Sequence, residues 1–124
     1  MAQNPNVLRE KSLTFAKRCV ALARVLKERG CEYPLRQQLL RSGTSIGANI
    51  AEAKYASSRK EFSAKLYISL RECAETLYWL ELLHTCDMLS QAEYGSLQAD
   101  CEELRLLLSS ATKTLRDTPV IPNS

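Results

Sequence analysis

Glycine, proline and aromatic residues are scarce in this chain. Its 124 residues include four glycines and four prolines, and Phe, Trp and Tyr together make up 6%. Small β-sandwiches and barrels need frequent turns and many aromatic residues, so this composition argues against them and favours helices. The length, with 45% apolar and 25% charged residues, fits a single domain with a modest hydrophobic core.

Membrane-spanning and export signals are also missing. No apolar run approaches the roughly 18 residues that a membrane span requires, and the first residues lack the apolar segment of a signal peptide. The five cysteines are odd in number and form no CxxC pair, which is typical of reduced thiols and not of a disulfide framework or a zinc site. We therefore expect a cytoplasmic protein without membrane contact.

Recognisable catalytic motifs are absent as well. The sequence has no GxxxxGK[ST] or GxGxxG loop for phosphates and no GxSxG or HExxH motif for hydrolysis. We therefore expect that the protein is not an enzyme and that it binds no cofactor and no metal ion.

Start and stop signals divide the chain into four helical segments. Asn4 suits the N-cap of the first helix, Gly30 its end, and Pro34 the first turn of the second. Capping boxes that begin at Ser58 and Ser90 open the last two helices. The predicted helices cover about 5–29, 34–55, 59–85 and 91–116 of a single domain, 1–118, which a flexible tail, 119–124, follows. Because short links make neighbouring helices antiparallel, we predict an all-α, up-down four-helix bundle.

The second helix contains two glycines where a helix former would be more stable. Gly43 and Gly47 each cost about 1 kcal/mol relative to alanine in a helix interior. A compensating reason is expected, and we predict that another backbone approaches closely at these positions.

The third helix carries apolar residues on most of its circumference. Its predicted core stripe comprises Phe62, Leu66, Leu70, Cys73, Leu77 and Leu80. The opposite face should be polar, yet it contains an indole and aliphatic side chains next to two carboxylates. The candidate interface residues on that face and its shoulder are Ile68, Glu72, Glu75, Tyr78, Trp79 and Leu82, and Tyr67 and Ala74 also lie on the shoulder. Since a helix that is apolar all round is normally buried all round, we predict an oligomer interface anchored by Trp79 and Tyr78. The alternative is a set of aromatic residues partly buried at the edge of the bundle.

Glu72 and Glu75 have a second interpretation. Two carboxylates three residues apart on one helix resemble half of a di-metal site in a helix bundle. Such sites use two Glu-x-x-His motifs, whereas this chain has one, from Glu81 to His84. Polar contacts across an interface are therefore favoured over a metal centre.

Three polar residues of the second helix share one face. Ser45, Asn49 and Glu52 lie within about 60° of one another at 100° per residue. They could bind a ligand, form hydrogen bonds to a neighbouring helix or subunit, or face solvent, and the sequence leaves these alternatives open.

Positive charge is concentrated in the first half of the chain. Residues 1–62 have 12 Lys and Arg against five Asp and Glu, a net charge of +7, whereas residues 63–124 have a net charge of −4. In the first helix, Arg9, Lys17, Arg24 and Lys27 fall within an arc of roughly 80° opposite the apolar seam. This basic stripe is a candidate phosphate-binding surface. A solvated face or pairing with the acidic half are the alternatives, and no aromatic residue on the stripe could stack on bases.

Three segments resemble a known family. They are residues 40–53 (LRSGTSIGANIAEA), 58–62 (SRKEF) and 65–80 (KLYISLRECAETLYWL), and they are similar to the bacterial four-helix-bundle proteins encoded in intervening sequences of large-subunit ribosomal RNA. Ser45, Asn49 and Glu52 belong to the sequence motif that carries this resemblance. The resemblance implies an antiparallel bundle that assembles into a ring-like homopentamer. Accessory variability proteins of diversity-generating retroelements resemble the same family; they are basic pentamers that bind a reverse transcriptase and nucleic acid, and as a group they are more basic than this chain, whose net charge is +3.

These features together predict a function of binding rather than of catalysis. We expect a non-enzymatic, homo-oligomeric binding or scaffold protein whose partner is RNA, an RNA–protein assembly or a reverse transcriptase-like protein. The alternative is a purely structural oligomeric module that contacts proteins and no nucleic acid.

Overall fold

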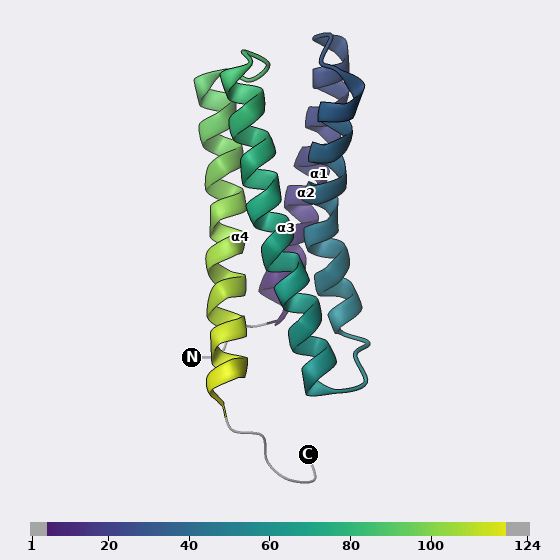
Figure 1. The fold of residues 1–124 in the computed structure, drawn as a ribbon, viewed down its shortest axis with the longest axis vertical. Helices are drawn as coiled ribbons and strands as arrows, with labels where there is room; N and C mark the ends of the chain where they lie inside the picture. The colour runs from purple at the N-terminus through teal and green to yellow at the C-terminus, as the bar shows by residue number, and fades with distance from the viewer. Residues whose placement is uncertain (1–4, 119–124) are drawn as a thin grey trace.

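The protein is all-α. The computed structural model describes residues 5–118, which form four helices and no strand. The helices are α1 (Pro5–Glu28), α2 (Tyr33–Ala53), α3 (Arg59–Thr85) and α4 (Gln91–Asp117), and they lie side by side along the long axis of the molecule (Figure 1). Each begins and ends within two residues of its predicted range. Asn4, the predicted N-cap of the first helix, and the predicted tail, 119–124, lie outside the described residues. Within the described part of the chain, no helix is long and apolar enough to cross a membrane.

Two of the links between helices turn through a residue with positive φ. Gly30 has a φ of 79°, and beyond it the Cys31 N–H donates to the Leu26 carbonyl at 2.9 Å. Asp87 has a φ of 63° in the corresponding position after α3. Glycine adopts this conformation readily, whereas a residue with a side chain is strained in it.

The predicted serine caps are present at both later helices. Ser58 Oγ accepts from the Glu61 N–H at 3.0 Å, and Ser90 Oγ accepts from the Glu93 N–H at 3.1 Å. The Glu93 carboxylate in turn accepts from the Ser90 N–H at 2.8 Å, which completes a capping box. The first predicted box differs, because the Glu61 carboxylate accepts from the Ser57 hydroxyl at 2.7 Å instead.

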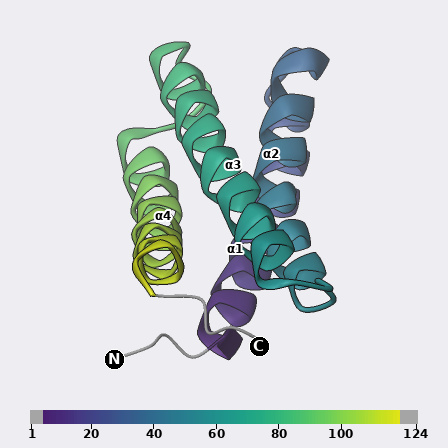
Figure 2. The same cartoon turned by 60° about the horizontal axis from the view of Figure 1, so that its bottom comes forward.

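Helix α3 is the central element of the packing. It lies between α2 and α4 (Figure 2) and packs closely on both, and α1 packs on α2, whereas α1 and α4 touch over few residues. The buried residues of α3 are Leu66, Ser69, Cys73, Thr76, Leu80 and Leu83. Phe62, Leu70 and Leu77 of the predicted stripe are only partly buried, so the core-facing side is rotated by about 40° from the prediction at 100° per residue.

Two hydrogen bonds to α2 accompany this rotation. The Ser69 hydroxyl donates to the Ile46 carbonyl at 2.7 Å, and the Thr76 hydroxyl donates to Ser42 Oγ at 2.9 Å. Ser69 and Thr76 are fully buried, and a buried hydroxyl with a partner avoids most of the cost of desolvation. Small, satisfied polar residues therefore take part in the contact between α2 and α3, and a periodicity of apolar residues alone does not reveal them.

The two glycines of α2 permit the close approach of α1. A Cβ atom added at Gly43 would lie 2.4 Å from Cys19 Sγ, and one added at Gly47 would lie 3.2 Å from Ser12 Oγ and 3.4 Å from the Ser12 carbonyl oxygen. The predicted close contact is thus present, and its partner at Gly43 is a side chain.

Candidate nucleic-acid interface

The four cations of the predicted basic stripe are all exposed on α1. Arg9, Lys17, Arg24 and Lys27 span about 27 Å at about 1.5 Å per residue. Among the described residues, no ion pair involves any of these four side chains. The stripe therefore presents positive charge that the described part of the chain does not neutralise.

Three other cations of the first helical region behave differently. Their ion pairs with α4 join Lys11 to Glu103 at 3.2 Å, Arg18 to Asp100 at 2.6 Å, and Arg29 to Glu93 at 2.7 Å. The Arg29 guanidinium, followed by the N-cap hydrogen bonds of Ser90, lowers the pKa of Glu93 to about 2. The sequence left open whether the basic stripe pairs with the acidic half of the chain. In the structure, the cations that pair with α4 are Lys11, Arg18 and Arg29, which do not belong to the stripe.

A polar cluster joins α2 to the face of α3 that lies opposite its predicted core stripe. Arg41 donates to Glu72 Oε2 at 3.0 Å and also to Glu75 Oε2, and the Trp79 indole N–H donates to the same Glu75 oxygen at 2.9 Å. The hydrogen bond from Trp79 and then the Arg41 guanidinium hold the pKa of Glu75 below its usual value. The sequence did not predict that Arg41 binds these two carboxylates, because the partner of an exposed arginine on one helix depends on the position of the neighbouring helix.

The cluster includes three of the six residues of the predicted oligomer interface, namely Glu72, Glu75 and Trp79. Of its six residues, Tyr78 is 57% exposed, whereas Ile68, Glu72, Glu75, Trp79 and Leu82 are half-buried. The rings of Tyr78 and Trp79 meet edge to face, with centroids 5.0 Å apart. Part of this face is therefore covered from within the chain by Arg41, and Tyr78 is its most exposed apolar group. An interface here stays a prediction.

The two carboxylates of α3 that resemble half of a di-metal site are engaged by a cation of α2. Glu72 and Glu75 bind Arg41, while the His84 ring stacks on Tyr94, with centroids 4.5 Å apart. In the described residues, no group of three or more His, Cys, Asp or Glu side chains could hold a metal ion.

The polar family motif of α2 makes contacts within the chain. Asn49 is buried, and its amide donates to the Ser45 carbonyl at 2.8 Å. Glu52 is exposed and forms an ion pair with Lys65 of α3 at 3.2 Å. Ser45 and Asn49 therefore make hydrogen bonds within α2, and Glu52 links two helices.

Comparisons with known proteins identify the family. The sequence model of the 23S rRNA-intervening sequence proteins matches residues 6–110. A crystal structure of a protein of unknown function from the S23 ribosomal protein family of Bacteroides thetaiotaomicron is similar, with a TM-score of 0.86 and 47% sequence identity over 89% of this chain and 98% of that one. No curated protein matches. The family match covers most of the chain, and the structural likeness extends over nearly the whole of the solved protein: this chain belongs to the 23S rRNA-intervening sequence protein family.

Proposed function

We propose that the protein is a non-enzymatic, homo-oligomeric RNA-binding protein whose α1 stripe contacts phosphates. The observation that carries the proposal is the division of the cations on α1 and directly after it into two sets. One set pairs with α4, whereas Arg9, Lys17, Arg24 and Lys27 are exposed with no ion pair in the described structure. Exposed, unneutralised cations along about 27 Å of a rigid helix suit a polyanion, because each phosphate contact releases a counterion.

Assembly would strengthen such a surface. We propose that the four helices form an antiparallel bundle and that five bundles form a ring, as the family resemblance suggests. Five copies of a weak site around one axis bind a long RNA with higher avidity than one copy does. The exposed Tyr78 ring, packed edge to face on Trp79, supports a contact between subunits, since exposed aromatic residues are favoured at the centres of interfaces.

The experiment that tests RNA binding compares two matched variants. The stripe variant changes Lys17, Arg24 and Lys27 to glutamine, and the control variant changes Lys60, Arg71 and Lys113, which are exposed on α3 and α4, to glutamine. Each removes two lysines and one arginine, so the net charge changes equally. Binding of a short fluorescent single-stranded RNA is measured by anisotropy across a salt series.

The expected result follows from the number of phosphate contacts. With four contacts in one subunit, the affinity of the unchanged protein should fall roughly 50-fold between about 50 and about 200 mM salt. The stripe variant keeps one contact, so its affinity should fall only about 2.6-fold. The control variant should keep the steep dependence. Equal losses of affinity in both variants would mean that net charge alone, and not the stripe, attracts the RNA.

The oligomer is tested separately by light scattering at micromolar concentration. We expect a mass several times the 14.0 kDa of the chain, and we expect Trp79→Ala to lower that mass while the helical circular dichroism persists. Tyr78→Ala should act in the same direction, because the two rings form one edge-to-face pair. A monomer in the unchanged protein would exclude the assembly.

A purely structural module is the second candidate function. The Glu52–Lys65 ion pair and the Asn49 hydrogen bond within the chain favour it, because the family motif then serves packing. An oligomer that binds no RNA in the experiment above would support this candidate.

A further inference from the structure

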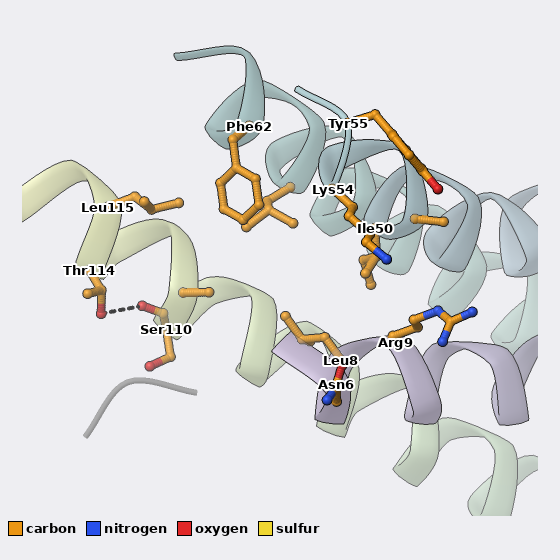
Figure 3. Close-up of a pocket in the computed structure, with 13 residues that line it drawn as sticks. Asn6, Leu8, Arg9, Ile50, Lys54, Tyr55, Phe62, Ser110, Thr114 and Leu115 are labelled. Atoms are coloured by element: carbon orange, nitrogen blue, oxygen red, sulfur yellow. Dashed lines mark hydrogen bonds between the residues drawn. The ribbon is translucent and has the colours of Figure 1, made fainter. Parts of the chain in front are cut away.

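A cavity of about 450 Å³ lies at one end of the bundle. The start of α1, the end of α2, the start of α3 and the end of α4 surround it, and Figure 3 shows side chains from all four helices around a common space. The apolar part of its wall comprises Leu8, Ile50, Phe62, Leu66, Ala111 and Leu115. Leu8, Ile50 and Leu66 belong to the hydrophobic core, so the cavity leads from the surface to the core.

Small residues on α4 leave this space open. Ser110, Ala111 and Thr114 face it, and α1 and α4 make few contacts along their length. The Thr114 hydroxyl donates to the Ser110 carbonyl at 3.0 Å, so it is satisfied within its own helix (Figure 3). The α4 wall therefore offers a ligand a mainly apolar surface.

Two cations stand at the edge of the cavity. Arg9 and Lys54 line it and are exposed, and their charged groups lie on the same side of the cavity, beside Ile50 (Figure 3). Neither side chain takes part in an ion pair within the described chain. The described lining residues include no Asp or Glu, so the charge at this edge is uncompensated.

We propose that this cavity binds a single-chain fatty carboxylate, with the alkyl chain inside and the carboxylate between Arg9 and Lys54. An apolar wall with a cationic edge matches an amphiphile that has one negative head group. The volume falls in the lower part of the range of small-molecule sites, about 300–1,000 Å³, which favours one alkyl chain over the two of a phospholipid. The site differs from the proposed RNA surface at Lys54, the C-cap residue that follows α2 and lies outside the stripe, whereas Arg9 belongs to both.

The test is calorimetric titration of the full chain with octanoate, decanoate and dodecanoate. Each CH₂ group that enters the cavity should strengthen binding about fourfold. Decylammonium, which has the same alkyl chain and the opposite charge, should bind more weakly than decanoate. Methyl NMR with decanoate should shift the signals of Leu8, Ile50 and Leu66.

Two variants locate the head group and the chain. Lys54→Gln should weaken decanoate binding by up to about fivefold, the range for an exposed ion pair, whereas Lys113→Gln, which removes a lysine that does not line the cavity, should leave it unchanged. Ala111→Phe should abolish binding by filling the cavity. Circular dichroism confirms that the helices persist, and if Ala111→Phe unfolds, Thr114→Leu reduces the same space.

Several results would overturn the proposal. They are no binding of any of the three carboxylates, equal binding of decylammonium and decanoate, and equal effects of the Lys54 and Lys113 substitutions. Decanoate binding that appears only after removal of residues 119–124 would mean that a segment of the chain itself is the occupant of the cavity, and this result would overturn the proposal too. Loss of RNA binding in the stripe variant has no bearing on these outcomes, because that variant leaves both Arg9 and Lys54 in place.

Discussion

Substitution of Gly43 by alanine probes the contact between α1 and α2 directly. Alanine removes the cost of a helical glycine, about 1 kcal/mol, but its Cβ atom would lie 2.4 Å from Cys19 Sγ, which belongs to a fully buried side chain. Overpacking of this kind costs about 1–3 kcal/mol. Gly95→Ala is the matched control, because nothing lies within 4 Å of its added Cβ.

The difference between the two variants isolates the clash. Both gain the same helix propensity, so Gly95→Ala should stabilise the protein by about 1 kcal/mol, and Gly43→Ala should be less stable than Gly95→Ala by about 1–3 kcal/mol. Urea unfolding followed by circular dichroism, at one protein concentration, measures both free energies of unfolding.

A double-mutant cycle identifies the atom responsible. Cys19→Ala removes the sulfur, so Gly43→Ala should become favourable in that background, and Cys19 and Gly95 should show no coupling. Equal stabilisation by Gly43→Ala and Gly95→Ala in the unchanged protein would refute the close approach of α1.

Three further predictions concern local features. Asp87→Gly should stabilise the protein by about 1 kcal/mol, because it relieves the strain of a side chain at a φ of 63°. Gly30→Ala should destabilise it by a similar amount. Thermal melts measure both effects, and an unchanged stability in either variant would contradict the strain. The Arg29 guanidinium, followed by the hydrogen bonds of Ser90, lowers the pKa of Glu93 from 4.5 to about 2, so that carboxylate contributes stability above about pH 4.5 and loses it as the pH falls towards 2. Urea unfolding across this range should show that the free energy of unfolding falls less with acid in Arg29→Gln than in the unchanged protein, and an equal fall would contradict the role of Arg29. Cys86 is the exposed cysteine among five free thiols, so a thiol reagent should modify one group quickly in the folded protein, and two fast groups would contradict the burial of the others.

Sequence reasoning worked best where local physics decides the structure. The serine N-caps before α3 and α4 and the glycine after α1 act within one turn of the chain, and the helices begin and end close to the predicted positions. It worked less well where polar residues are buried. Ser69 and Thr76 count as polar in any periodicity, yet a partner on α2 satisfies each of them.

The candidate sites show the same division. The basic stripe was visible in the spacing of α1, but its distinction from the cations that pair with α4 required the position of α4, as the Arg18–Asp100 pair shows. Likewise, the role of Arg41 depends on two carboxylates that lie more than 30 positions later in the chain. No periodicity links residues at that separation.

The scarcity of turn residues, the capping signals and the helical spacing were sufficient to establish four helices and a basic face on the first. The tertiary structure alone decided how far α3 is rotated about its axis, which cations are neutralised, and where the bundle leaves a cavity lined by Leu8, Ile50 and Phe62. The physical reason is range. Capping and helix propensity act between neighbours in the chain, whereas burial, ion pairing and packing depend on which helices meet.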